Sequence, residues 1–544
     1  MTATAPAPET IQGIPADIYH RRWIVLGVLC ISLVLVVVAV SSLNVALPTI
    51  QETLGASGTQ LQWILDGYAL VFAGCLLLAG AIGDRWGRKG ALQCGLVLFG
   101  VAAVIATLAK SATVLIAARS LMGVGAAFIM PATLSIVINC FPFAERPKAI
   151  AVWSGFAGVG GALGPISSGL LLKWFWWGSV FFVNLPLVVL LLVLSAFLVP
   201  SSRDPEERPL DVLGAALSVV SLVSLVYAVI EGPGKGWSHP AVVAGFAVAV
   251  VGGYAFVRYE LVRQHPMLDP RLFRLRGFSS GAASVTLVFF SMFGMFFLLT
   301  QYLQFVKLYS PLQAGVRVLP SACALLLVAP QGPRIVGALG VRRTVRIGFA
   351  LQAVGLGILA FATYATAYPV IAVALVITGT GTAMVMPCSS QHIVGALPLS
   401  KAGVGSAVND VTREVGGALG IAVAGSIVAS LYQTRTGFVD AVADPAARAL
   451  ARDSVGKAVT VARRGLASGQ IPQSVYDTFV RQAGVAFNHG TQTALWALSG
   501  IALLASAIVG SVIPDKLPGR AVPSHAPAPV QAPAAPPAVD ANPA

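Results

Sequence analysis

The sequence predicts an all-α integral membrane protein with about fourteen transmembrane helices. Of its 544 residues, 56% are hydrophobic and only 10% are charged, whereas soluble proteins carry about 25% charged residues. The mean hydropathy of +0.82 agrees. Apolar stretches of about 20 residues, the length that crosses the hydrocarbon, recur along the whole chain. We expect the spans to begin near Trp23, Leu61, Gly90, Ala112, Ile150, Gly178, Asp211, Ala241, Phe278, Ala314, Ile347, Pro369, Ala402 and Thr493.

The basic residues predict the orientation of these spans. The formal net charge is +14, but the basic side chains are scattered over short loops and form no single face, so nucleic acid is not an expected partner. They fall in alternate connections, and lysine and arginine collect on the cytoplasmic side of membrane proteins. We therefore expect a multi-pass membrane protein with both termini in the cytoplasm; the family resemblance described below implies the bacterial cell membrane.

A short, charged, glycine-rich turn joins the second and third predicted spans. Two neighbouring helices must leave the hydrocarbon and re-enter it within a short loop, and glycine permits such a close backbone turn. The turn reads Gly-x-x-Gly-Asp-Arg-x-Gly-Arg-Lys and resembles the loop after the second helix of major facilitator transporters. The resemblance implies a cytoplasmic gating loop made of Gly80, Gly83, Asp84, Arg85, Gly87, Arg88 and Lys89. We expect Asp84 to dock against the positive N-terminus of the thirteenth span and hold the two halves together.

An acidic residue, Asp66, lies about two helical turns inside the second span. An ionisable side chain within the membrane is costly, and it is therefore a functional hypothesis by default. Burial disfavours the charged carboxylate, so this group can load and release a proton as its exposure changes. The alternative is a helix-end carboxylate wetted by an outer cavity. In similar drug exporters, an acidic residue at this position takes part in proton coupling or substrate binding.

Arg119 lies inside the fourth span. Arginine does not lose its proton in proteins, so this side chain must be paired or hydrated. Its spacing to Gly123 and Gly125 resembles the fourth-helix motif of the superfamily, although Met122 replaces the usual glutamine. The motif implies that Arg119 assists proton transfer by acting on a nearby carboxylate. A purely structural ion pair with an acidic group is the alternative.

The fifth span contains a helix signature of small residues and proline. Small residues four positions apart let helices approach closely, and proline bends a helix. A tight helix crossing alone would account for the pattern. Its spacing also resembles the fifth-helix motif that distinguishes antiporters from symporters, which favours export over import. The signature residues are Gly160, Gly164, Pro165 and Gly169.

A second copy of the glycine-rich turn lies at residues 333–343, where Gly340 matches Gly87 and Gly337 takes the place of Asp84. The repeat indicates a duplication, and major facilitator transporters are built from two pseudo-symmetric six-helix bundles. We therefore expect this fold with two inserted helices. The expected parts are a cytoplasmic tail at 1–22, a first bundle at 23–200, an inserted helix pair at 201–260, a second bundle at 261–513 and a disordered Pro/Ala-rich cytoplasmic tail at 514–544.

The thirteenth span holds a constellation of charges, Asp410, Arg413 and Glu414. Asp410 lies about 12 Å into the span and Glu414 lies one turn deeper on the same face. Two neighbouring carboxylates in a dry site repel each other, so we expect them to titrate as one unit, with Arg413 neutralising one of them. An internal salt-bridged surface is the alternative. The stretch also resembles the thirteenth span of actinobacterial drug exporters, which implies a second protonation centre.

Two further features have weaker signals. An outer segment at 432–490 is charged, and its apolar residues recur every third or fourth position, which predicts either short amphipathic helices or a solvated linker without function.

The first span resembles that of the family but has Ala39 where an acidic residue often stands. A substrate cavity is the other weak prediction, and simple polar interface residues are its alternative. Its candidate residues are Asn44, Tyr68, Gln301 and Gln304.

Together these resemblances imply a fourteen-span drug:proton antiporter of the actinobacterial type, which uses the proton-motive force to expel drugs or antibiotics by alternating access. The expected partners are a small lipophilic drug-like substrate, protons and the lipid bilayer, with the protein acting as a monomer. Alternatives are a proton-coupled nutrient importer, an exporter of an endogenous metabolite or lipid, and a receptor or scaffold without transport activity. We expect no enzyme activity, cofactor or metal, because the sequence has no phosphate-binding loop, nucleophile elbow or metal-ligand cluster.

Overall fold

The computed structural model describes residues 10–11, 14–142, 145–203, 210–264, 266–397 and 402–515. Within this part of the chain, fourteen segments are helical, long and apolar enough to cross a membrane. The predicted all-α multi-pass architecture is therefore confirmed. Of the predicted tail at 514–544, residues 516–544 lie outside the described residues. Near the start of the chain, Thr10–Ile11 (β1) pairs with Ile14–Pro15 (β2) in a short antiparallel ribbon.

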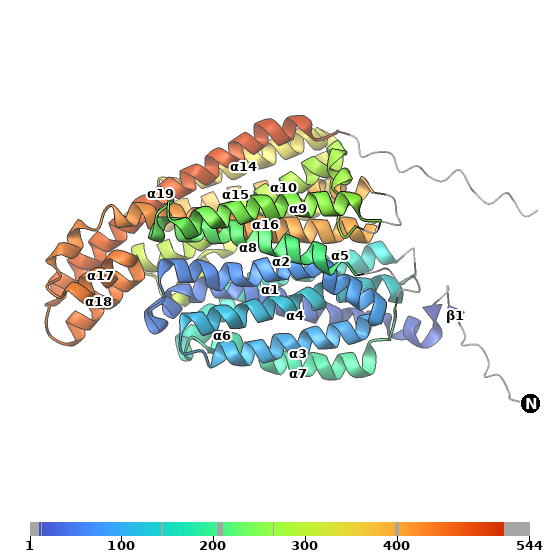
Figure 1. Ribbon diagram of the computed structural model, residues 1–544, viewed down its shortest axis with the longest axis horizontal. Helices are drawn as coiled ribbons and strands as arrows, with labels where there is room; N and C mark the ends of the chain where they lie inside the picture. The colour runs from blue at the N-terminus through green and yellow to red at the C-terminus, as the bar shows by residue number, and fades with distance from the viewer. Residues whose placement is uncertain are drawn as a thin grey trace, which may run out of the picture.

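The first six spans and the last six form two packed groups (Figure 1). The first six are Ala16–Leu54 (α1), Gly58–Trp86 (α2), Arg88–Thr107 (α3), Ala112–Cys140 (α4), Arg146–Trp174 (α5) and the pair Ser179–Phe182 (α6) and Asn184–Leu198 (α7). The last six are Arg276–Gln301 (α10) with Tyr302–Val306 (η2), the broken span Pro311–Arg317 (α11), Leu319–Val328 (α12), Ala329–Gln331 (η3) and Gly332–Leu339 (α13), then Val341–Ala360 (α14), Tyr368–Gly395 (α15), Ala402–Gln433 (α16) and Gln473–Val512 (α19).

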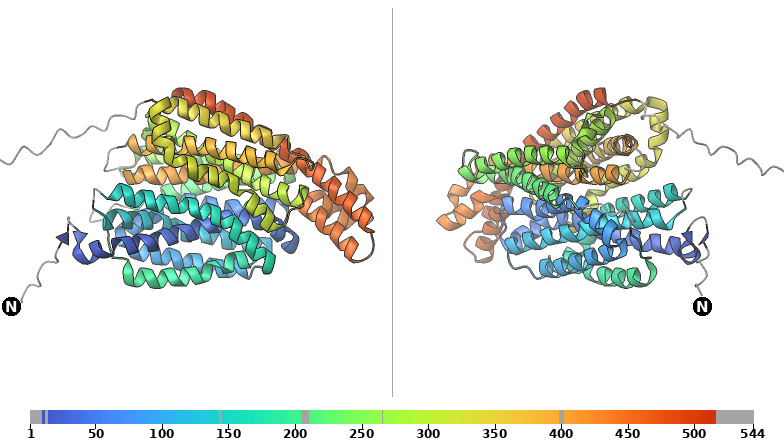
Figure 2. Two further views of the ribbon diagram at one scale, coloured as in Figure 1. Left: turned by 180° about the vertical axis from the view of Figure 1, so that it is seen from behind. Right: turned by 45° about the vertical axis from the view of Figure 1, so that its right-hand side comes forward.

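The inserted pair, Val212–Lys235 (α8) and Pro240–Val262 (α9), stands at the side of the molecule (Figure 2). The short helix Pro270–Arg274 (η1) follows it. Helix α8 packs against both α2 and α16, while α9 packs mainly on α8. The pair therefore covers a seam where the two six-helix groups meet.

The two glycine-rich turns have the same backbone construction. Gly87 ends α2 with φ +121°, and its N–H donates to the carbonyl of Gly83. Gly340 ends α13 with φ +77°, and its N–H donates to the carbonyl of Val336. Only glycine adopts such angles readily. The two copies thus share backbone conformation as well as sequence, which is what a duplicated unit would produce.

Glycine also allows helices to pack closely where hydrocarbon offers no hydrophobic driving force. A Cβ atom at Gly125 on α4 would lie 2.7 Å from the backbone nitrogen of Phe99 on α3. A Cβ atom at Gly420 on α16 would lie 2.9 Å from the Cα of Phe290 on α10. The backbones at these crossings are too close for any larger residue.

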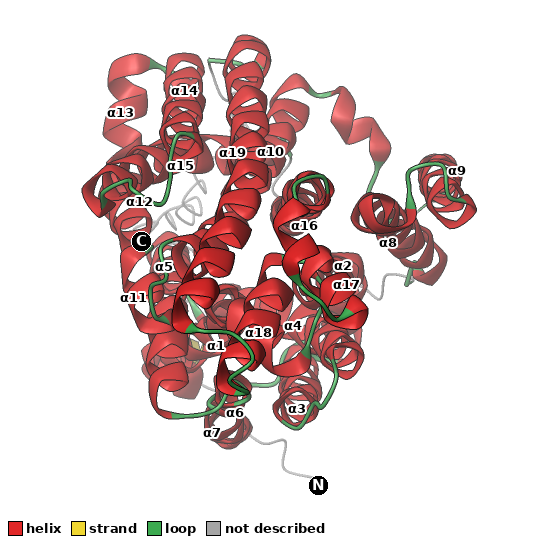
Figure 3. Cartoon of the chain, turned by 90° about the vertical axis from the view of Figure 1, so that its left-hand side faces the viewer, coloured by secondary structure: helices red, strands yellow, loops and turns green. Residues whose placement is uncertain are grey.

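The segment after α16 folds into short helices, Gly437–Ala441 (η5), Pro445–Asp453 (α17) and Val455–Ala467 (α18). We call residues 434–472 the cap. The end of the molecule that carries the cap is the cap end, and the opposite end, where the described chain starts and stops, is the terminal end (Figure 1). Seen from the cap end, α18 lies over the end of α1, with which it is in contact (Figure 3).

Two predicted helix boundaries are wrong. Helix α1 begins at Ala16 instead of Trp23, because Asp17 and Arg21 form an ion pair one turn apart that extends the helix beyond its apolar part. Helix α19 begins at Gln473 instead of Thr493, since its first turns pack against α18 and bury Phe479. The two helices have 39 and 40 residues, about twice the length that crosses the hydrocarbon, and hydropathy indicates only their apolar part.

Candidate functional site

Asp66 is completely buried on α2, about 12 Å from the start of that helix. A capping box, in which Ser57 and Gln60 exchange hydrogen bonds, fixes where α2 begins. Neither carboxylate oxygen of Asp66 has a hydrogen-bond partner among the described residues. Asp66 is thus not a helix-end carboxylate wetted by an outer cavity, which was the alternative in the sequence analysis. A lone charge in such a place is costly, so the arrangement suits the neutral acid.

The surroundings of Asp66 are apolar and come from both groups of helices. Its neighbours on α2, Ala69 and Leu70, pack with Val226 of α8 and Ala422 of α16. Asp66 is therefore carried by a helix whose surface meets the second group and the inserted pair. A relative movement of the two groups would change the surroundings of this carboxyl.

Arg119 is fully buried on α4, but it does not pair with an acid among the described residues. Its guanidinium donates to the carbonyl oxygens of Ile64 (3.2 Å) and Ala39 (3.4 Å). It also lies over the ring of Tyr68, 4.4 Å from the ring centroid. The structural ion pair of the alternative reading is therefore not seen among the described residues, and the role of Arg119 in proton transfer stays a prediction. Ala39 stands where the family often has an acidic residue, and here its backbone carbonyl accepts a hydrogen bond from Arg119.

The charges of α16 form a compact group in which Arg413 serves two carboxylates. Its Nη1 lies 3.6 Å from Oδ1 of Asp410, and its Nε lies 3.3 Å from Oε1 of Glu414. The side chain of Glu414 is only 7% exposed, whereas those of Asp410 and Arg413 are about 20% exposed (19% and 21%). Oε2 of Glu414 is buried without a partner. Glu414 is thus the drier acid, with one oxygen left to bind a proton.

Tyr68 connects the two arginine sites. Its ring is stacked against Arg119, and its hydroxyl is in electrostatic range of Glu414 and Arg413. That hydroxyl is buried and has no hydrogen-bond partner among the described residues. Asp66 and Glu414 lie at different heights along the membrane normal. Gln62 of α2 touches Gly425 of α16 in this antiparallel pair, which places Asp66 about 10 Å from the level of Glu414.

The gating loop is held mainly by its own half. Arg88 pairs with Asp84 at 2.7 Å, and Lys89 donates to the carbonyl of Ala196. Arg85 occupies the last turn of α2. In the last turns of α2, Gly80 lies close to Pro131 of α4, and Gly83 lies close to Ala91 of α3. The residues just before α16, 398–401, lie outside the described part, so the docking of Asp84 on that helix stays a prediction.

The fifth-helix signature lies where α5 meets one helix of each group. A Cβ atom at Gly164 would lie 2.8 Å from the backbone nitrogen of Ser42 on α1, and Ser41 donates to the carbonyl of Gly160. A Cβ atom at Gly169 would lie 2.6 Å from the Cα of Leu312 on α11. Pro165 lies within α5, and its carbonyl touches Gly315 of α11. The signature is therefore a tight crossing that also joins the two groups.

The remaining candidates are dispersed. Gln304 donates to the carbonyl of Val45 across the two groups, and Gln301 donates to the carbonyl of Phe297. Oδ1 of Asn44 is buried without a partner among the described residues. With Tyr68 in the charged centre, these residues line no common cavity that the structure describes.

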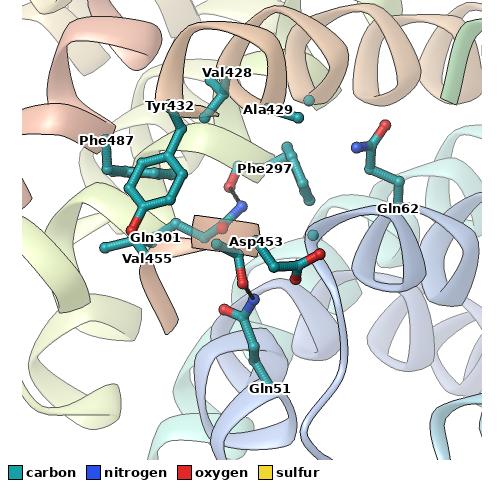
Figure 4. A pocket seen from close by; sticks show the side chains of 13 residues that line it. Gln51, Gln62, Phe297, Gln301, Val428, Ala429, Tyr432, Asp453, Val455 and Phe487 are labelled. Atoms are coloured by element: carbon teal, nitrogen blue, oxygen red, sulfur yellow. Dashed lines mark hydrogen bonds between the residues drawn. The ribbon is translucent and has the colours of Figure 1, made fainter. Parts of the chain in front are cut away.

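Sequence analysis did not predict a small pocket at the cap end, whose walls combine polar and apolar side chains (Figure 4). It has a volume of about 40 Å³ and is lined by residues of five helices, α1, α2, α10, α16 and α19, and of the cap. We call it the cap-end pocket. Sequence reasoning missed it because its residues come from distant segments and are ordinary interface types. They are Gln51, Gly58, Gln62, Phe297, Gln301, Gly425, Val428, Ala429, Tyr432, Asp453, Ser454, Val455 and Phe487.

The cap is tied to the first group beside this pocket. Gln51 at the end of α1 donates to the hydroxyl of Ser454, and Arg463 pairs with Glu52 at 2.6 Å. Partial burial disfavours the charged guanidinium of Arg463, but the hydrogen bond and negative charge of Glu52 outweigh this and raise its pKa. The ion pair therefore holds the cap against α1.

A second, larger pocket of about 250 Å³ lies between the inserted pair, α2, η1, α10 and α16. We call it the lateral pocket. Its walls are mostly apolar, with four hydroxyl side chains among them. The lining residues are Leu77, Ser218, Ser221, Leu222, Gly253, Phe256, Leu268, Phe273, Thr286, Val408, Val411, Thr412 and Val415.

Comparison with known proteins gives consistent matches. Residues 29–421 match the Major Facilitator Superfamily. The multidrug efflux pump LfrA of Mycolicibacterium smegmatis is 35% identical over 92% of this chain and 98% of that protein. The methylenomycin A resistance protein of Streptomyces coelicolor is 33% identical over 79% of this chain and 91% of that protein. A solved bacterial homologue of the lysosomal transporter Spinster, in an inward-facing conformation, superposes with a TM-score of 0.59 at 17% identity, over 91% and 97% of the two chains.

Proposed function

Because this chain belongs to the Major Facilitator Superfamily, we propose that it is a secondary transporter that exports lipophilic drugs or antibiotics in exchange for protons. A relative that covers 92% of this chain is named for multidrug efflux, and one that covers 79% is named for methylenomycin A resistance. The fifth-helix signature favours the same direction of transport.

One observation carries the proton coupling. Asp66 on α2 and Glu414 on α16 are dry carboxyl groups, each with oxygen atoms that lack partners among the described residues. The two helices belong to different six-helix groups and pack against each other. Alternating access moves such groups relative to one another around a central site. Each carboxyl would then meet water from one face of the membrane at a time, which links its protonation to the open face.

We assign the cap end to the outside and the terminal end to the cytoplasm. The two glycine-rich turns lie at the terminal end of their helices, and they carry Arg85, Arg88, Lys89, Arg342 and Arg343. Positive residues of short loops favour the cytoplasmic side of the cell membrane. Both chain termini would then be cytoplasmic.

The bundles at 23–200 and 261–513 would act as the two moving bodies, with the pair at 201–260 covering their seam. In the proposed cycle Asp84 docks on α16 when the cytoplasmic face is closed and releases it when that face opens. The tight crossing of α5 and α11 would serve as a contact that reforms in each cycle. One chain supplies both bundles and every proposed proton site, so we propose that a monomer transports.

The lateral pocket gives the proposed substrate a chemical description. Its apolar walls and hydroxyl groups suit a lipophilic molecule with few hydrogen-bonding groups. Its place beneath the inserted pair would let such a molecule arrive from the bilayer.

The decisive experiment measures efflux of ethidium, a fluorescent drug-like dye, from a drug-sensitive bacterial host that expresses the protein. We expect a proton uncoupler to abolish pumping, and Asp66→Asn and Asp410→Asn to reduce it at least about tenfold. Asp440→Asn is the matched control, because Asp440 is an exposed cap residue paired with Arg452. Efflux that is insensitive to the uncoupler would refute proton antiport, and full pumping by both variants would refute the assignment of proton coupling to Asp66 and Asp410.

A further inference from the structure

The walls of the cap-end pocket contain hydrogen-bond acceptors that lack donors. Gln51 and Gln62 are 2% and 1% exposed, and Oε1 of each amide has no partner among the described residues. A buried oxygen without a hydrogen-bond donor is destabilising. A donor in the pocket that binds these two oxygens would remove that cost. The pocket is large enough for at least one water molecule and has the polar partners that a buried water needs.

The exposure of the polar side chains decreases from the mouth of the pocket to its floor. Asp453 stands at the mouth with its side chain 37% exposed. Gln62 forms the floor, where Gly425 leaves room for it, since a Cβ atom at Gly425 would lie 2.5 Å from the Gln62 amide carbon. Asp66 follows Gln62 by one helical turn on the same face of α2, about 6 Å further from the mouth. Figure 4 shows the Gln62 and Asp453 side chains in this pocket.

From this arrangement we propose that the cap-end pocket is a water-filled intake chamber through which protons from outside reach Asp66. Asp453 collects protons at the mouth, and Gln62 is the last polar group before the dry carboxyl. The proposal deepens the antiport function and depends on it. It adds a route for protons to the coupling scheme. It also assigns roles to Asp453 and Gln62, which the scheme does not otherwise use.

The charged groups around the route are compatible with it. Lys457 lies 3.1 Å from Asp453 and balances its charge. Tyr432 of α16 also faces Asp453, and its hydroxyl donates to the carbonyl of Ala451. The Arg463–Glu52 pair, described above, flanks the mouth.

Near the floor of the pocket, the indole of Trp63 donates to Glu231 of α8. Further along α2, Arg119 and the Arg413–Glu414 pair are the charges near Tyr68. Among the described lining residues, Asp453 is the only acidic side chain.

The chamber is assembled from both halves of the transporter. Gln51 and Gln62 belong to the first six helices, whereas Gln301 and Asp453 come after the inserted pair. The hydrogen bond from Gln51 to Ser454, 3.0 Å long, closes the gap between them. Separation of the halves at the cap end would break this contact and join the chamber to outside water.

The test uses purified full-length protein in liposomes, with ethidium as the substrate and a trapped pH-sensitive dye that reports proton counterflow. We expect Gln62→Leu, which makes the floor apolar, to slow ethidium-driven proton flux about tenfold. Gln62→Asn keeps an amide and should retain most of the flux. Exchange of labelled for unlabelled ethidium, which needs no net proton movement, should change less than about twofold in all variants. Gln433→Leu, at an exposed end of α16, is the matched control.

The second variant acts at the mouth, on a side chain that is 37% exposed. Asp453→Asn should reduce the flux several-fold and shift its half-maximum to a lower external pH, while Asp440→Asn in the same cap should leave both unchanged. Flux equal to that of the wild type in both Gln62→Leu and Asp453→Asn overturns the chamber. If Gln62→Leu does not reach the membrane, unchanged flux in Asp453→Asn alone overturns it. Wild-type protein that moves ethidium without protons would instead refute the antiport function.

Discussion

At the scale of single residues, the protein treats its membrane charges in two different ways. Asp66 is alone, and neither of its oxygens accepts a hydrogen bond from the described residues. Arg413 is shared by Asp410 and Glu414, so each of these three charges has a partner. A lone buried carboxyl is a cost to folding, whereas a buried ion pair becomes strongly destabilising when one partner is removed and the other charge is left unpaired. The two sites should therefore respond to substitution in opposite ways.

Asp66→Asn should not destabilise the protein, although it should abolish proton-coupled pumping. The carboxyl has no partner to lose, and an amide never has to shed a charge in the dry site. We expect thermal unfolding of the purified protein in detergent at the same temperature as the wild type or higher. A clear fall in the unfolding temperature would mean that Asp66 has a stabilising partner in the folded protein.

Arg413→Leu should be strongly destabilising, by about 3–5 kcal/mol, because it leaves two buried carboxylates without their cation. The matched control is Arg452→Leu, which removes an exposed ion pair with Asp440 and should cost about 1 kcal/mol or less. The comparison is again made by thermal unfolding. Equal losses in the two variants would show that the α16 charges are solvated in the native protein.

How far the sequence predicted this site depended on the kind of contact. Asp66 and the Asp410–Glu414 pair were found because a carboxylate in an apolar span stands out from its neighbours. The partners of Arg119 were not found, because they are backbone carbonyls of Ala39 and Ile64, and residue type does not encode a carbonyl acceptor. The cap-end pocket was missed for another reason: distant segments meet there, and only tertiary structure brings them together.

At the scale of elements, glycine decides where helices turn and how closely they approach. The turn after α2 requires Gly87 at φ +121°, an angle that strains any residue with a side chain by roughly 1–3 kcal/mol. Helix existence and number were predictable from hydropathy. Helix ends were not, since α1 and α19 continue beyond the apolar region through polar residues that pack against their neighbours.

Gly87→Ala should therefore lower the amount of folded protein in the membrane and slow transport. Gly90→Ala, three residues later, is the control, because its backbone has no positive φ and a Cβ atom there meets nothing within 4 Å. The measurements are membrane yield by immunoblot and initial ethidium efflux per transporter. Normal yield and efflux in Gly87→Ala would show that the turn tolerates a different backbone conformation.

At the scale of the whole molecule, the cap and the first six helices must separate if the cap end opens during transport. The contacts that oppose separation are the Gln51–Ser454 hydrogen bond and the Arg463–Glu52 ion pair. Because the cap is continuous with α16 and α19 of the second group, it bridges the two halves that alternating access moves apart. A covalent link across this contact should stop the cycle.

The pair Gly58→Cys and Ser454→Cys offers such a link. A Cβ atom built at Gly58 of α2 lies 3.8 Å from the Cβ of Ser454, close to the mean separation in disulfides, about 3.8 Å. We expect an oxidant to abolish ethidium efflux by the double variant and a reductant to restore it, because the bond holds the cap end closed. Each single variant and the wild type, whose six cysteines are all free, should keep pumping under the same oxidant. Undiminished efflux by a double variant shown to be cross-linked would mean that substrate leaves without separation of the cap from α2.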